Sequence, residues 1–108
     1  MPTPLFPVLD RIRQLIATPS VSSVSPQFDQ SNRPVIELLA GWLEDAGFAV
    51  RIEPLPGQPD KANLIAVLGR GPGGLVLAGH TDTVPYDAGR WRFDPFGGTV
   101  ADGRIYGL

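Results

Sequence analysis

The sequence predicts an α/β protein with a mixed sheet, and three observations lead to this fold class. Apolar residues recur at intervals of three and four in residues 5–16 and 35–46, which is the periodicity of an amphipathic helix. Residues 48–53 alternate between apolar and polar side chains, as a half-buried strand does. Residues 64–68 and 75–78 are apolar throughout, which indicates strands covered on both faces, as in the sheets of α/β proteins.

The first helix is predicted to begin at Thr3 and Pro4, which have the residue types of an N-cap and a first helical position. It is predicted to end before Thr18, because the proline that follows Thr18 disfavours a helical conformation there. Residues 20–31 are rich in serine and glutamine and have neither periodicity, so a loop is expected. The second helix is predicted from Ser31 or Asn32 to Gly47.

The strands are predicted to form one sheet. Pro54 and Pro56 end the alternating strand, which suits an edge position. The two apolar runs are joined by residues 69–74, and this six-residue connection is too short for a parallel crossover, so it predicts an antiparallel hairpin. Residues 90–96 are expected to be a loop, and residues 98–106 a second hairpin that turns at Asp102-Gly103. Two helices cannot cover both faces of such a sheet, so part of it should be exposed.

Composition excludes several classes of protein. A chain of 108 residues forms one domain at most. The net charge is -2 and the nine Lys and Arg residues are scattered, which argues against a nucleic-acid partner. No apolar run approaches the roughly 18 residues needed to cross a bilayer. Residues 1–4 lack the basic region and apolar core of a signal peptide. A cytoplasmic protein without a membrane partner is expected.

The apolar run 75–78 is followed by Gly79, His80, Thr81 and Asp82. Ligands of open α/β sheets bind at the carboxyl ends of the strands, which is where these residues are expected to lie. His80 is the only histidine, and the chain has no cysteine. Imidazole is a common ligand of transition metals, and its second ring nitrogen is usually held by a carboxylate. The spacing His-x-Asp can bring both side chains to one side of an extended backbone. Spacing alone leaves open whether the pair binds a metal or is an ordinary surface histidine beside an aspartate.

A longer pattern surrounds this pair. Residues 76–85 read VLAGHTDTVP, and they are followed by Trp91, by Asp-Pro-Phe at 94–96 and by DGRIYG at 102–107. This combination resembles the first metal-binding segment of the M20 family of dinuclear metallopeptidases and deacylases. The resemblance continues through most of the chain, including residues 15–20 and 39–42.

The resemblance implies a dinuclear zinc-dependent exopeptidase-like fold and a metal-dependent amidohydrolase that acts on a small acylated amino acid. His80 matches a ligand of one of two metal ions, Zn²⁺ or Co²⁺, and Asp82 matches the catalytic aspartate that orients this histidine. The complete protein is expected to be a homodimer. Substrate-binding residues are not assigned by the resemblance.

The resemblance also implies that residues 1–108 are the N-terminal portion of the catalytic, metal-binding domain. An aspartate that bridges the two ions is expected a few residues beyond Tyr106 and Gly107, and the other ligands, the general base and a dimerisation domain are expected elsewhere. The 108-residue chain alone is therefore predicted to be inactive. Two alternatives remain open at this point: another activity of the same family, such as that of a desuccinylase or a carboxypeptidase, or a truncated, non-catalytic interaction module.

Overall fold

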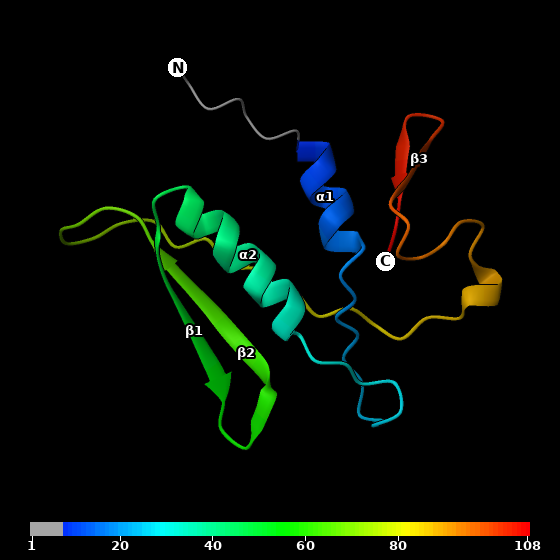
Figure 1. Ribbon diagram of the computed structural model, residues 1–108, viewed down its shortest axis with the longest axis horizontal. Coiled ribbons are helices and arrows are strands. Elements are labelled where there is room, and N and C mark those ends of the chain that lie inside the picture. Colours follow the sequence, from blue (N-terminus) through cyan, green and yellow to red (C-terminus); the bar gives the residue numbers. More distant parts are fainter. Residues whose placement is uncertain (1–7) are drawn as a thin grey trace.

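The computed structural model describes residues 8–108, which form two α-helices, one 3-10 helix and two separate two-stranded antiparallel sheets (Figure 1). In chain order the elements are α1 (Val8–Ile16), α2 (Arg33–Asp45), β1 (Ala49–Leu55), β2 (Gln58–Val67), η1 (Ala88–Arg90), β3 (Thr99–Ala101) and β4 (Arg104–Tyr106). The predicted α/β class is confirmed in its helices and strands. The prediction of a single mixed sheet is wrong, because the β1–β2 and β3–β4 hairpins form two separate antiparallel sheets.

Both predicted helices are present. The proposed start of the first at Thr3 lies outside the described residues, and its end before Thr18 is confirmed, because α1 ends at Ile16. The second runs from Arg33 to Asp45, and Gly47 follows with a φ of 94° that a residue with a Cβ rarely adopts. The loop predicted between the helices is confirmed.

The β1–β2 hairpin replaces the hairpin predicted between residues 64–68 and 75–78. β1 pairs antiparallel with β2, with Ala49 opposite Val67, and the chain reverses through Pro56 and Gly57. This two-residue turn lies between strands that are adjacent in sequence, so β2 reaches β1 at a small entropic cost. The four glycines in 69–74 all have positive φ and lead the chain away from β2 instead of back along it.

Residues 75–77 therefore form no strand. Leu75, Val76 and Leu77 are 84–88% exposed and pair with no strand of residues 8–108. The prediction that this run is a buried strand is wrong for the described part of the chain. The related expectation, that two helices leave apolar strand residues exposed, is confirmed, since Val67 at the end of β2 and Leu68 after it are also exposed.

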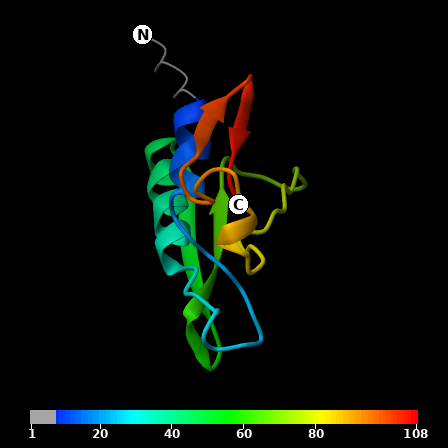
Figure 2. The ribbon, with the colours of Figure 1, turned by 90° about the vertical axis from the view of Figure 1, so that its right-hand side faces the viewer.

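The core lies between α2 and the β1–β2 hairpin. Figures 1 and 2 show α2 lying along one face of the hairpin. Val35 and Ile36 from α2 meet Ala62 from β2, and Leu15 from α1 packs against this cluster. Only a few side chains are buried among the described residues, so the hydrophobic effect stabilises this part of the chain over a small area.

The β3–β4 hairpin turns at Asp102-Gly103, as predicted. Both residues have positive φ, 54° and 72°, which is the conformation of a type I′ turn. The hairpin lies beside α1: Arg13 Nε donates to the carbonyl of Gly98 at 3.0 Å, and Gly107 lies so close to Ile16 that an added Cβ would be 2.6 Å from its side chain. None of the helices described in residues 8–108 is long and apolar enough to cross a membrane.

Candidate functional site

His80 and Asp82 lie in contact. His80 Nδ1 is 3.0 Å from Asp82 Oδ1 and also 3.0 Å from the Asp82 carbonyl oxygen. The two side chains are 82% and 61% exposed, respectively. The contact that the His-x-Asp spacing predicted is therefore present, whereas the predicted roles of His80 as metal ligand and Asp82 as catalytic residue stay predictions.

The geometry assigns the tautomer of His80. Both atoms facing Nδ1 are oxygens that accept, so the ring proton is on Nδ1. Nε2 then carries the lone pair, and it has no hydrogen-bond partner among residues 8–108. This is the arrangement in which a histidine ligates a metal through one nitrogen while a carboxylate holds the other.

One imidazole is nevertheless far from a complete metal site. No group of three or more His, Cys, Asp or Glu side chains among residues 8–108 is arranged to hold an ion. The chemistry of the His80–Asp82 pair fits one ligand of a transition-metal site, and any further ligands would have to come from outside the described residues.

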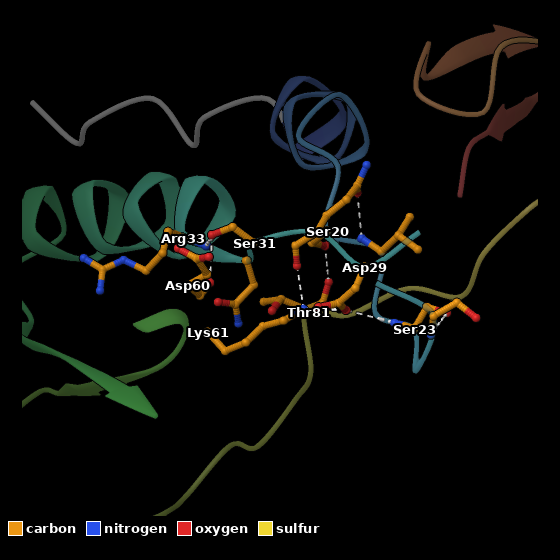
Figure 3. Close-up of polar contacts among 12 residues, drawn as sticks. Ser20, Ser23, Asp29, Ser31, Arg33, Asp60, Lys61 and Thr81 are labelled. Carbon is orange, nitrogen blue, oxygen red and sulfur yellow. Dashed lines mark hydrogen bonds and ion pairs between the residues drawn. The ribbon is translucent and has the colours of Figure 1, made fainter. Parts of the chain in front are cut away.

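The segment that carries the pair is held by the loop after α1. Val21 and Thr83 form a parallel β-bridge, in which the amide of Ser22 donates to the Thr83 carbonyl at 2.9 Å and the amide of Thr83 donates to the Ser20 carbonyl at 3.1 Å. The Ser20 hydroxyl donates to the Thr81 carbonyl at 2.5 Å (Figure 3). These bonds fix the backbone on both sides of Asp82.

The loop is in turn fixed to β2. Lys61 Nζ donates to Asp29 Oδ1 at 2.9 Å and to the carbonyl of Gln30 (Figure 3). Gln30 Oε1 accepts from the Val21 amide at 2.9 Å. Asn32 is one of the two residues at which the second helix is predicted to begin, and it is the N-cap of α2. Its side chain bonds both the amide and the carbonyl of Ala62, at 2.8 and 2.9 Å. The loop is therefore ordered by contacts with a strand about thirty residues away in sequence.

Sequence reasoning missed this support. Composition and the lack of periodicity predict a loop here, but the residues that hold it are ordinary serine, aspartate and lysine residues in the sequence. The available signal was its content of Ser, Asp and Asn, whose side chains readily bond nearby backbone. That signal does not identify a partner 61 residues away, which is the separation of Ser20 and Thr81.

The environment of Asp29 changes the acidity of its carboxyl group. The amide of Ser23 donates a hydrogen bond to its carboxylate, Lys61 adds a second, and together they hold the pKa of Asp29 below its ordinary value of 3.8. Because the folded pKa is lowered, the contribution of Asp29 to stability is complete above 3.8 and is lost as the pH falls through the lower, folded value.

The pH dependence of stability should therefore change in Asp29→Asn. The wild-type protein is expected to lose this contribution below about pH 4, whereas the variant lacks it at every pH. Thermal unfolding of the complete protein between about pH 7 and about pH 3 measures the difference. Lys61→Met is a useful comparison, because it should raise the pKa of Asp29 only part of the way while the Ser23 amide remains. If the melting temperatures of wild type and Asp29→Asn changed identically with pH, Asp29 would not be the source of this pH-dependent stability.

A hollow of about 270 Å³ lies next to His80, and α1, α2 and the 80–83 segment line it. Its walls are mostly apolar, with Ile16, Leu39 and Phe96 among them. Thr83 also lines it, and the Thr83 hydroxyl oxygen is buried without a hydrogen-bond partner among residues 8–108. His80 therefore lies at the edge of a mostly apolar hollow.

Comparison with known proteins supplies a name for relatives of the chain. No protein-family model matches it. It is 62% identical to the acetylornithine deacetylase of Pasteurella multocida (strain Pm70) over 94 residues. This aligned region is 87% of this chain and 25% of that protein. It is 55% identical over 104 residues to the acetylornithine deacetylase of Photorhabdus laumondii subsp. laumondii, and the aligned region is 96% of this chain and 27% of that protein. The acetylornithine deacetylase of Shigella sonnei (strain Ss046) is 53% identical over all 108 residues, 28% of its length.

The chain thus spans about a quarter of the length of the curated relatives it matches. The similarity covers nearly all of its residues, including His80, Asp82 and the motifs around them. The resemblance read from those motifs is confirmed, and the chain is homologous to about a quarter of an acetylornithine deacetylase.

Proposed function

We propose that the complete protein to which this chain corresponds is a metal-dependent amidohydrolase that converts N-acetyl-L-ornithine and water into L-ornithine and acetate, a reaction of arginine biosynthesis. The observation that carries the proposal is the 53–62% identity of the chain to proteins named acetylornithine deacetylase. Residues 1–108 would be the N-terminal portion of its catalytic domain, in the cytoplasm, and the complete protein would be a homodimer that binds a small acylated amino acid.

The proposed cofactor is a pair of Zn²⁺ or Co²⁺ ions. Neutral imidazole suits both metals, and the free Nε2 of His80 is the donor that this chain offers. A divalent ion, when bound, supplies a Lewis acid that polarises the amide carbonyl and makes water more acidic.

The residues of this chain have supporting roles in that reaction. His80 would contribute one ligand through Nε2. Asp82 would keep the proton on Nδ1 and hold the plane of the ring, because a carboxylate at 3.0 Å accepts that proton in a fixed direction. The apolar walls of the neighbouring hollow would exclude water on one side of the ligand. Residues 8–108 hold no group of three potential metal ligands, so the 108-residue chain by itself should not catalyse hydrolysis.

The experiment is to express the complete protein, load it with Zn²⁺ or Co²⁺ and measure the acid released from three substrates: N-acetylornithine, N-succinyl-diaminopimelate and a dipeptide. Acetate release from N-acetylornithine at the highest kcat/KM is expected. Faster cleavage of either other substrate would replace the proposed substrate with that of a desuccinylase or a carboxypeptidase. No turnover of any of them would favour a non-catalytic module. The protein stripped with a chelator is the control, and it should be inactive until metal is returned.

A further inference from the structure

We propose that Ser20 is a positioning residue for the His80–Asp82 pair, acting through the backbone on either side of Asp82. The proposal rests on the proposed function, because it assumes that this pair serves a metal. One of its tests is made on the metal-free protein.

Ser20 holds both peptide groups that flank the Asp82 Cα atom. Its hydroxyl donates to the carbonyl of Thr81, in the peptide before Asp82. Its own carbonyl accepts from the amide of Thr83, in the peptide after Asp82, at 3.1 Å. Because φ and ψ are the only soft backbone torsions of a residue, fixing the two flanking peptides fixes the backbone of Asp82.

The peptide after Asp82 also faces the histidine. The Asp82 carbonyl, in the same peptide as the Thr83 amide, is 3.0 Å from His80 Nδ1, and the Asp82 carboxylate starts from the same Cα. A rotation of either peptide would therefore move both acceptors away from the ring. Ser20 thus determines where the two oxygens that select the His80 tautomer lie.

Ser20 is suited to hold this position. It is 5% exposed and is the only buried polar residue in the described part of the chain. Its neighbour Val21 is 3% exposed and is fixed through Gln30. By contrast, residues 75–77 just before the pair are 84–88% exposed. Within residues 8–108, the hydrogen bonds that attach the 75–85 segment to other parts of the chain all come from residues 20–22.

A nucleophilic role for Ser20 does not fit these contacts. Its hydroxyl proton is directed to the Thr81 carbonyl, and the hydroxyl has no hydrogen bond to His80 within residues 8–108. A serine nucleophile requires a base within hydrogen-bond distance of its hydroxyl. The contacts of Ser20 therefore assign it to support of the pair.

The test compares Ser20→Ala, Ser20→Thr and Ser25→Ala in the complete protein. Ser20→Ala removes the hydroxyl, Ser20→Thr keeps one, and Ser25→Ala removes a hydroxyl of the same loop that makes no hydrogen bond in the described residues. Two quantities are measured besides activity: the affinity for Zn²⁺, by competition with a chelator, and the ¹⁵N shifts of the His80 ring in the metal-free protein, which report the tautomer.

Ser20→Ala is expected to weaken Zn²⁺ binding by about 10-fold, the lower end of the range for residues that orient a ligand. Its ¹⁵N shifts should show a smaller fraction of the Nδ1–H tautomer. Ser20→Thr should restore both quantities, and Ser25→Ala should resemble wild type. If Ser20→Ala does not fold, Ser20→Cys keeps the size of the side chain with a weaker donor and should give an intermediate tautomer ratio.

Unchanged Zn²⁺ affinity and unchanged ¹⁵N shifts in a folded Ser20→Ala protein would overturn the proposal. A lower melting temperature with wild-type tautomer and affinity would also overturn it, since it would show a role in stability alone. Failure of the proposed function is distinguishable: wild-type protein would then bind no Zn²⁺ through His80, while the metal-free tautomer measurement would still decide whether Ser20 positions the pair.

Discussion

His80→Ala in the complete protein is expected to lower kcat/KM for N-acetylornithine by more than about 100-fold, which exceeds the usual cost of losing a residue that only orients a ligand. His80 is the only histidine of this chain, so no other imidazole in it can replace the lost Nε2 donor. Metal content should fall in parallel, because the ion loses a protein ligand. Steady-state kinetics and elemental analysis of the purified variant measure the two effects.

Asp82→Ala should be less severe. The imidazole remains, but its ring loses the carboxylate at 3.0 Å that holds the proton on Nδ1, so a loss of about 10- to 100-fold in metal affinity or activity is expected. Glu53→Ala is the matched control, since Glu53 is an exposed acidic residue on β1 whose ion-pair partner is Arg51. Near-normal turnover in His80→Ala would show that the His80–Asp82 pair is an ordinary surface contact. The losses expected for His80→Ala and Asp82→Ala would then have no basis.

The features that the sequence predicted correctly are those determined by neighbouring residues. α2 follows from the spacing of its apolar side chains and from the glycine after its end, and the β3–β4 turn follows from Asp102-Gly103. The contact of His80 with Asp82 is of the same kind, because two residues separated by one position on an extended chain point to the same side. In each case the physical cause lies within a few residues.

The features that were predicted wrongly, or missed, depend on distant partners. An apolar run indicates that its side chains favour burial, but it does not specify what covers them. Residues 64–67 pair with β1, which a two-residue turn connects to β2, whereas residues 75–77 pair with no strand among the described residues and are exposed. The bond from Ser20 to Thr81 joins residues 61 positions apart, and no local pattern in the sequence encodes it. Strand pairing and the support of the loop therefore depend on long-range contacts that the local sequence does not specify.

Expressed alone, the 108-residue chain is expected to be marginally stable and to self-associate. Leu75, Val76 and Leu77 are exposed and consecutive, and they pair with no strand of residues 8–108. Such an apolar segment readily pairs with another chain. The buried apolar residues of the described chain are few, so little hydrophobic energy opposes unfolding. Sedimentation velocity over a range of concentrations, together with thermal unfolding, measures both properties.

Val76→Lys should shift the sedimentation profile towards monomer, because a charge in the middle of the run opposes strand pairing. Val24→Lys is the control: Val24 is also fully exposed, but it lies in the loop after α1, outside the apolar run, and its replacement should leave association unchanged.

Zn²⁺ should bind the isolated chain no more tightly than a single surface imidazole does, since residues 8–108 hold no group of three potential ligands. A monomeric chain that unfolds cooperatively and binds zinc stoichiometrically at submicromolar concentration would contradict the prediction, because it would show that these residues by themselves contain a stable core and a complete site.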